Sequence, residues 1–301
     1  MYSIDILAKK YPKRYGSFLA IIGVLILTPD TMVMRFSNLD KWSLMGWRGI
    51  LMGITLFILW NFFIKCEKRK ELKSLFSFQG IIFIFAFAIN SICFTLGIIE
   101  TSVMVVLTAV ATMPVFAAIL SSVFMKESQG FLGWITIILA MIGVYIVVSD
   151  GNNAVGHPEG SVVLGGFFGI LTAFGLALIF TLSRRYPELG VVPAGGIGAF
   201  ISGLVGFSLS SIDYIFNAPI WTILCMGVLI LPLSFTFLFI APRYTSSSVV
   251  SLVMLLEMVI GPFWVWIGVG ESPSIVMIYG AALVVFAITF HIFRTQFLQQ
   301  N

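Results

Sequence analysis

The sequence predicts an all-α membrane protein whose ten transmembrane helices form a 5+5 inverted-topology repeat. Three observations predict this fold class: the composition, the placement of basic residues and an internal repeat. Of the 301 residues, 59% are hydrophobic and 10% are charged, and the mean hydropathy is +1.06. A soluble domain is about 25% charged, so the composition excludes a water-soluble globular enzyme. It also excludes a disordered chain, which requires low hydrophobicity.

Each expected helix is an apolar segment long enough to cross a bilayer, which takes about 20 residues. The apolar runs are continuous, whereas a membrane β-barrel alternates polar and apolar residues. In chain order, we expect spans at 17–36, 42–64, 78–98, 102–124, 131–149, 162–183, 193–212, 219–240, 245–267 and 274–293.

Lysine and arginine fall almost entirely on alternate connections between these spans. With the N-terminus inside, the inner segments carry 14 basic residues, and the outer connections carry only Arg35 and Lys41. Basic residues favour the cytoplasmic side, so both termini are predicted to be cytoplasmic, which requires an even number of spans. The basic N-terminal segment precedes an apolar run without a small-residue cleavage site, so we expect the first span to be retained. This topology is consistent with a bacterial cytoplasmic (inner) membrane.

The longest outer connection divides the chain almost in half. Residues 151–161 belong to a loop without Lys or Arg, and we interpret them as an extracytoplasmic hinge. The first five-helix repeat then covers residues 1–150 and the second covers residues 162–301.

Two segments align without a gap when the chain is shifted by 144 residues. Thr101-Ser102 falls on Thr245-Ser246, and Glu127-Ser128 falls on Glu271-Ser272. The segments are spans four and nine, and five spans per half means that the second copy crosses the membrane in the opposite direction. Inverted repeats are typical of secondary transporters, with the substrate between the repeats. The alternative is chance similarity of two apolar spans.

Several motifs together resemble the EamA-type, ten-helix transporters of the drug/metabolite transporter (DMT) superfamily. They are Arg48 in GWRGILMG, the segment ATMPVFAAILSSVFMKES, Tyr244-Thr245-Ser246, Glu257, Pro262 and Gly270-Glu271. The first copy departs from the family pattern, because Glu100 replaces the usual Tyr and Lys126 replaces the Gly before Glu127. The resemblance implies alternating-access transport, often export. It does not identify the cargo, which ranges over amino acids, nucleotide-related metabolites, vitamins and drugs.

Three ionisable residues lie inside predicted spans, where such groups are costly and face a cavity or a partner. Asp30 and Arg48 lie at similar depth in the outer half, so they either form a static ion pair or contact a charged cargo. Glu257 lies near the middle of span nine among apolar neighbours, with no countercharge in its own helix. It is a candidate for proton coupling or for contact with a cationic cargo, and the alternative is a neutral structural acid.

Two further residues are candidate contacts for the cargo. Asn90 in span three is expected either to bond a neighbouring helix or to line the site. Trp264 lies seven residues after Glu257 on the same helical face, where it could stack on a cation or belong to the interfacial belt. Prolines free backbone carbonyls that often line cavities in carriers. We expect interruptions at Pro29, Pro114, Pro232 and Pro262.

Small residues recur every four positions in two spans. Such stripes permit close helix packing, either within the bundle or at a homodimer contact. They comprise Gly165, Gly169, Ala173 and Ala177 in span six, and Gly195, Ala199 and Gly203 in span seven.

Motifs for other chemistry are missing from the sequence. We find no P-loop, HExxH, GxSxG or clustered His/Cys set, so we expect neither ATP hydrolysis by this chain alone nor an enzyme. The three cysteines show no metal or disulfide spacing. No cofactor, metal or nucleic-acid partner is expected.

The sequence therefore predicts a secondary active or facilitative transporter that exports a small amino-acid-like or amine-like metabolite by alternating access. The proton is a candidate coupling ion, and the bilayer and the cargo are the expected partners. One alternative is multidrug or quaternary-amine efflux, although Arg48 argues against a purely cationic cargo. Another is a non-transporting scaffold, which has little use for the buried charges of Asp30, Arg48 and Glu257.

Overall fold

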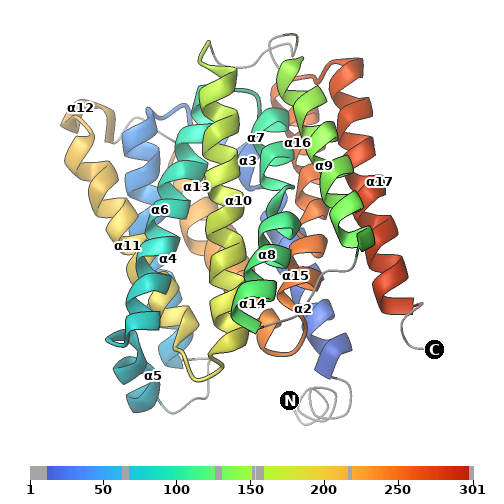
Figure 1. Ribbon diagram of the computed structural model, residues 1–301. Helices are drawn as coiled ribbons and strands as arrows, with labels where there is room; N and C mark the ends of the chain where they lie inside the picture. The colour runs from blue at the N-terminus through green and yellow to red at the C-terminus, as the bar shows by residue number, and fades with distance from the viewer. Residues whose placement is uncertain are drawn as a thin grey trace.

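The computed structural model describes residues 12–62, 68–125, 131–150, 153, 159–215 and 219–297, and within these ranges its regular structure is helical (Figure 1). The helices stand side by side as one bundle. In chain order they are α2 (Pro12–Leu27), α3 (Asp30–Ser37), α4 (Lys41–Phe62), α5 (Lys68–Leu75), α6 (Phe78–Glu100), α7 (Val103–Val110), α8 (Met113–Met125), α9 (Phe131–Ser149), α10 (Val162–Arg185), α11 (Val191–Leu209), α12 (Ile212–Ile215), α13 (Ile220–Leu224), a π-helix (Cys225–Ile230), α14 (Leu231–Ile240), a 3₁₀ turn (Ala241–Arg243), α15 (Ser247–Val253), α16 (Leu255–Val269) and α17 (Ile275–Phe297).

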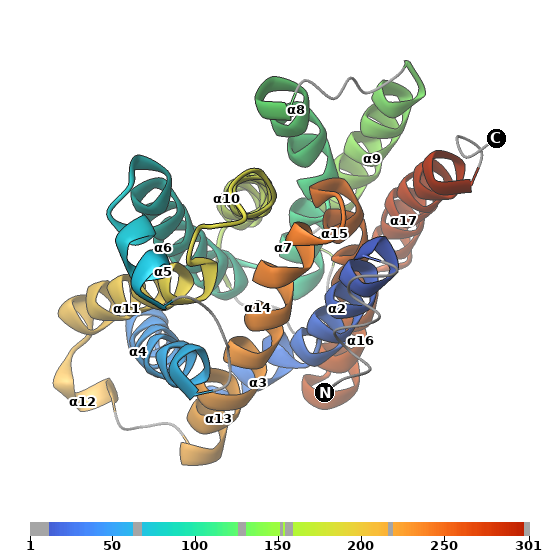
Figure 2. The ribbon, with the colours of Figure 1, turned by 90° about the horizontal axis from the view of Figure 1, so that it is seen from below.

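Eight helical units in the described ranges are long and apolar enough to cross a membrane, as expected for a multi-pass membrane protein. They occupy the positions predicted for spans one to four and six to nine, with ends that differ by a few residues. Helices α9 and α17 lie where the fifth and tenth spans are predicted, and they run side by side at one edge of the bundle (Figure 2).

Four of the membrane-crossing units are interrupted near their middles. A turn at Thr28–Pro29 separates α2 from α3, a turn at Ala111–Thr112 separates α7 from α8, and a wide π-helical turn precedes α14. Each of these interruptions lies within a few residues of a proline, which lacks a backbone N–H and clashes with the preceding helical turn. The break between α15 and α16 lies at Met254.

The expected interruption at Pro262 is wrong, because α16 continues through this proline. Proline is tolerated inside membrane helices where neighbouring helices pack against the loosened turn. Here the preceding Gly261 lies against Leu107 of α7, so closely that an added Cβ would be 2.5 Å from the Leu107 Cδ1 atom. Packing therefore holds the turn helical.

The two aligned segments fold alike. Ser102 caps α7 by accepting a hydrogen bond from the Val105 N–H, and Ser246 caps α15 by accepting one from the Val249 N–H. The short helix then ends in a turn, and a longer helix follows. Met254 is 144 residues after Val110, the last residue of α7. The interruption therefore falls at nearly the same position of the two aligned segments.

Glycines bring helix backbones unusually close. A Cβ on Gly49 of α4 would lie 2.3 Å from the backbone nitrogen of Gly203 in α11. A Cβ on Gly165 of α10 would lie 2.3 Å from the Cγ2 atom of Thr101. Both small-residue stripes that the sequence suggests thus include members that pack within the chain.

Candidate functional site

A cavity lies where the interrupted helices meet, and it is lined mainly by apolar side chains. The space in the cavity and at its opening, open solvent included, is about 480 Å³. Residues at the interruptions of spans one and nine line it, including Leu27 and Met254. Its polar lining residues are Asp30, Arg48, Asn90, Ser91, Thr172 and Glu257.

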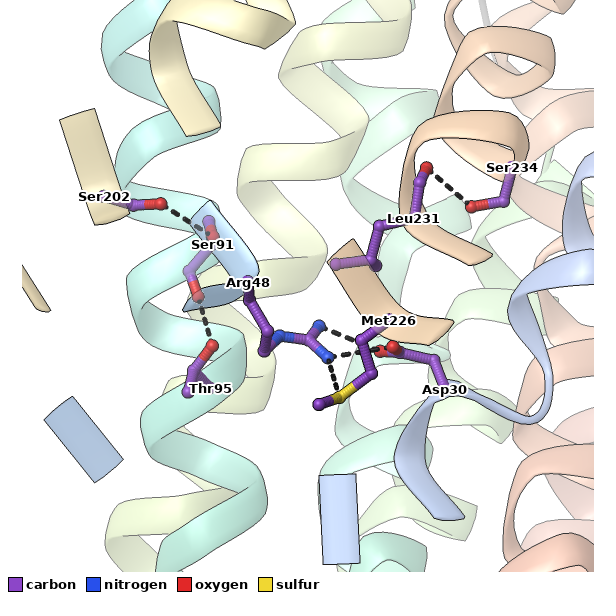
Figure 3. A network of polar contacts seen from close by, with 8 residues as sticks. All are labelled: Asp30, Arg48, Ser91, Thr95, Ser202, Met226, Leu231 and Ser234. Atoms are coloured by element: carbon purple, nitrogen blue, oxygen red, sulfur yellow. Dashed lines mark hydrogen bonds and ion pairs between the residues drawn. The ribbon is translucent and has the colours of Figure 1, made fainter. Parts of the chain in front are cut away.

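Asp30 and Arg48 form a buried, bidentate ion pair at this cavity (Figure 3). The Nη1 and Nη2 atoms of Arg48 lie 2.9 and 2.8 Å from the two carboxylate oxygens of Asp30. The Arg48 guanidinium also contacts the Met226 sulfur at 3.6 Å and lies 5.9 Å from the centre of the Phe94 ring. Its positive charge is therefore already matched, which leaves little of it for a cargo carboxylate.

Glu257 is the second acid of the cavity, beside the paired Asp30. Its side chain is buried, with the residue 4% exposed, and it lies in the first turn of α16, directly after the break at Met254. Within the described part of the chain, its carboxylate has no hydrogen-bond or ion-pair partner. The cavity can thus present a carboxylate to a cation or a proton.

Asn90 adds a second hydrogen-bond acceptor. It lies on α6, is 4% exposed, and its Oδ1 atom has no hydrogen-bond partner among the described residues. Gly175 of α10 lies so close that an added Cβ would be 3.2 Å from the Asn90 Cβ. The base of the Asn90 side chain thus packs directly against α10.

Ser91, beside Asn90, connects the cavity wall to neighbouring helices. Its hydroxyl accepts a hydrogen bond from Ser202 of α11 at 3.1 Å, and its carbonyl accepts one from Thr95 at 2.9 Å (Figure 3). The Ser202 bond attaches α6 to α11 at the level of the cavity, and the Thr95 bond lies within α6.

Trp264 does not line the cavity. Its indole N–H donates to the Thr28 hydroxyl at 3.3 Å, and the residue is 38% exposed. Seven residues of helix correspond to about 10 Å along the axis, so sharing a face with Glu257 still places Trp264 well beyond it. The hydrogen bond joins α16 to the interruption of span one.

The structure also shows lining residues that the sequence did not single out. Phe87, Phe94 and Phe235 line the cavity, and the rings of Phe87 and Phe235 meet edge to face at 5.2 Å. With 29 phenylalanines in the chain, nothing in the sequence distinguishes these three from lipid-facing ones.

A second polar cluster, which we call the outer latch, comprises Arg35, Thr101, Val103 and Glu271. Glu271 pairs with the Nε of Arg35 at 3.0 Å and accepts a hydrogen bond from the Val103 N–H at 2.6 Å. Arg35 also donates to the Thr101 carbonyl at 2.8 Å. The sequence marked Glu271 only as the end of a repeat and as part of the Gly270-Glu271 motif, and Arg35 only as an outer charge. Glu127, the counterpart of Glu271, lies outside the described residues.

Known proteins share both the sequence pattern and the fold. Residues 14–149 match the model of the EamA-like transporter family. The "Uncharacterized transporter YdfC" of Bacillus subtilis (strain 168) is 23% identical over 211 residues, which cover 68% of this chain and 67% of that protein. A solved crystal structure with 11% identity covers 91% of this chain and 94% of its own, with a TM-score of 0.65. The family resemblance expected from the motifs is confirmed, and the solved structure shows a shared fold.

Proposed function

Residues 14–149 belong to the EamA-like transporter family, and on this premise we propose that the protein is a secondary active or facilitative transporter. Its cargo is a small metabolite with an amine group, bound in the cavity beside Glu257. The cavity opens alternately to the two sides of the membrane, and the proposed direction is export from the cytoplasm.

The observation that carries this proposal is the unpaired carboxylate of Glu257 inside an otherwise largely apolar cavity. An isolated buried charge is costly, and intramembrane acids mark substrate or proton pathways by default. A cationic cargo or a proton removes that cost when it binds. The proton is therefore the coupling ion that we propose, with Glu257 as its carrier.

The packing of the helices supports a 5+5 inverted repeat in which residues 1–150 and 162–301 are the two copies. Span one packs on span eight through α2 and α14, and span six packs on span three through α10 and α6. In a 5+5 repeat, span one corresponds to span six and span eight corresponds to span three, so the two contacts are equivalent. The hinge proposed at 151–161 lies mostly outside the described residues.

The charge distribution supports the proposed location and orientation. With both termini in the cytoplasm of a bacterial cell, 14 basic residues face inward and two face outward, as the positive-inside rule favours. A homodimer is not part of the proposal, because members of both small-residue stripes pack within the chain.

A second candidate, efflux of quaternary amines, gains from one observation. Arg48 is paired with Asp30, so its charge no longer argues against a cationic cargo. The acceptors Glu257 and Asn90 nevertheless favour a cargo with N–H donors, because a quaternary ammonium group cannot donate a hydrogen bond to either. An amino acid would add a carboxylate for which the paired Arg48 leaves no free charge.

Thermal unfolding of the purified protein with matched ligands tests the cargo class. We would compare phenethylamine, its N-trimethylated analogue, phenylalanine and 3-phenylpropionate. A ligand present at a hundred times its Kd stabilises the folded state by about 2.7 kcal/mol. We expect stabilisation by phenethylamine alone, its loss in Glu257→Gln, and its retention in Glu100→Gln, a control acid at the outer edge of the bundle.

Other results would contradict the proposal. Stronger stabilisation by the trimethylated amine would favour the second candidate, and equal stabilisation of Glu257→Gln would remove Glu257 from the site. Counterflow of radiolabelled amine in proteoliposomes then tests transport itself. Binding without counterflow in the wild-type protein would contradict the transporter assignment.

A further inference from the structure

The outer latch joins three segments that are distant in the sequence. Arg35 belongs to α3, Thr101 and Val103 flank the start of α7, and Glu271 follows α16. Both Glu271 oxygens are engaged, one by the Arg35 side chain and the other by a backbone N–H. The side chains of Arg35 and Glu271 are 12% and 4% exposed. The latch is therefore a buried contact between elements and not a local surface ion pair.

The chain turns sharply to place Glu271 in the latch. Gly270 ends α16 in the left-handed region, with a φ angle of 80°, a conformation that glycine adopts without the steric cost of a side chain. The Gly-Glu sequence at the end of span nine therefore has a structural purpose, because it returns the carboxylate toward α7.

Each of the three latch helices also reaches the cavity. Helix α3 begins at Asp30, α7 ends at Val110, and α16 carries Glu257 in its first turn, and all three residues line the cavity. An eight-residue helix such as α3 or α7 is about 12 Å long. The three helices thus fill the space between the cavity and the latch.

Helix α16 packs tightly on both α3 and α7. A Cβ on Gly261 of α16 would lie 2.5 Å from Leu107 of α7 and 3.7 Å from the Thr31 hydroxyl oxygen of α3. One on Gly268 would lie 2.5 Å from the Met32 sulfur of α3. Figure 1 shows α3, α7 and α16 in the same half of the bundle, and α16 contacts both of the others. Access to the cavity from this end requires them to separate.

We propose that the outer latch is the gate that keeps the cavity closed toward this end of the molecule. The inference rests on the proposed transport function, because a gate has a purpose only if cargo enters and leaves. Opening requires that Glu271 release Arg35 and the Val103 N–H together, since one carboxylate holds both. Removing either side chain leaves its buried partner without a countercharge, which favours the open, hydrated arrangement.

Labelling of a cavity cysteine from each side of the membrane tests this gate. The reporter is Thr172→Cys on α10, in a chain whose native cysteines Cys66, Cys93 and Cys225 are replaced by serine. A membrane-impermeant maleimide is added to vesicles of either orientation. We expect labelling from the latch side to be at least tenfold faster in Glu271→Gln and in Arg35→Gln, with no acceleration from the opposite side. Glu100→Gln, at the same end but outside the latch, should label like the parent.

A charge exchange separates gating from folding. The double variant Arg35→Glu with Glu271→Arg should label more slowly than either reversed single variant, because the ion pair is restored. All variants must elute as monodisperse protein in detergent. Unchanged labelling in folded Glu271→Gln and Arg35→Gln would overturn the gate, and so would equal acceleration from both sides.

The outcome also distinguishes the gate from the proposed cargo. Faster labelling from the latch side without transport of any tested amine would support the gate and contradict the cargo assignment. Unchanged labelling with normal amine transport would overturn the gate and leave the proposed function intact.

Discussion

The two aligned segments, α7 with α8 and α15 with α16, share a backbone design but differ at one central position. Each begins with a serine cap, breaks after a short helix and continues in a longer one. The shift of 144 residues places Met113 opposite Glu257. Met113 is 1% exposed within the core, whereas Glu257 lines the cavity. The two aligned segments thus share interrupted helices, and they differ in that only the second carries an acid at this position.

The halves also differ in how they accommodate buried charge. The first half pairs Asp30 with Arg48 on adjacent membrane-crossing units, and the second half leaves Glu257 without a partner among the described residues. Paired charges can serve the fold, while a lone acid is stabilised only by something that binds it. Substitutions of Asp30 and Glu257 test this contrast experimentally.

The largest effect is expected when Glu257 is replaced by methionine, the residue at the equivalent position, 113, of the first aligned segment. Glu257→Met should reduce amine counterflow at least tenfold, the factor that corresponds to about 1.4 kcal/mol of lost interaction. Stability in detergent should be unchanged or higher, because an uncompensated buried acid is removed. Met113→Leu, a volume-conserving change at the equivalent position, should transport normally. Normal counterflow in Glu257→Met would remove the functional difference between the copies.

The next largest effect concerns the paired acid. Asp30→Asn should lower the free energy of unfolding by about 3–5 kcal/mol, because it leaves the buried Arg48 charge uncompensated. Replacing Arg48 with Met in the same chain should recover much of this loss. Chemical denaturation in detergent measures both values. If Asp30→Asn lowered the free energy of unfolding no more than Glu257→Gln does, the paired and the unpaired acid would not differ in their contribution to stability.

A smaller effect is expected where the halves touch backbone to backbone. Gly49→Ala should cost about 1–3 kcal/mol, as overpacking of a well-packed core does, since its Cβ would lie 2.3 Å from Gly203 N. Gly97→Ala is the control, because its Cβ would meet nothing closer than 3.3 Å. Equal midpoints in thermal unfolding for the two variants would contradict the close approach of α4 and α11.

The smallest effect is expected at the serine caps of α7 and α15, and it tests whether the two caps are equivalent. Ser102→Ala and Ser246→Ala should each cost about 1 kcal/mol, the usual value for a lost helix N-cap. Comparable losses in denaturant unfolding would support matched caps. A loss confined to one variant would show that only one of the two short helices depends on its cap.

Most of the fold could be predicted because the information is local. Continuous apolar runs position the helices within a few residues, and the breaks beside Pro29, Pro114 and Pro232 follow from proline geometry. The break at Met254 could not be predicted, because no local signal marks it. The interruption expected at Pro262 was wrong, because tight packing around Gly261, which the local sequence does not reveal, keeps that turn helical.

The sequence could predict contacts in the candidate site only where the depth of two residues along their spans was enough to bring them together. Asp30 and Arg48 lie at matching depth on consecutive spans, which made an ion pair one of the two expected alternatives. Trp264 shares a helical face with Glu257, but distance along the helix separates it from the cavity. The outer latch joins residues 236 positions apart, and nothing local in the sequence connects Arg35 with Glu271.

The contact of α4 with α11 has a consequence for how the protein is made. Gly49 and Gly203 are 154 residues apart, from 203 minus 49. At about 5–20 residues per second of synthesis, roughly 8–30 s pass between the emergence of the two glycines from the ribosome. During that interval the glycine-lined groove of α4 faces lipid or the insertion machinery instead of α11. The first half is therefore inserted into the bilayer before the face of α4 that packs on α11 is covered. Assembly is completed only when α11 has been synthesised.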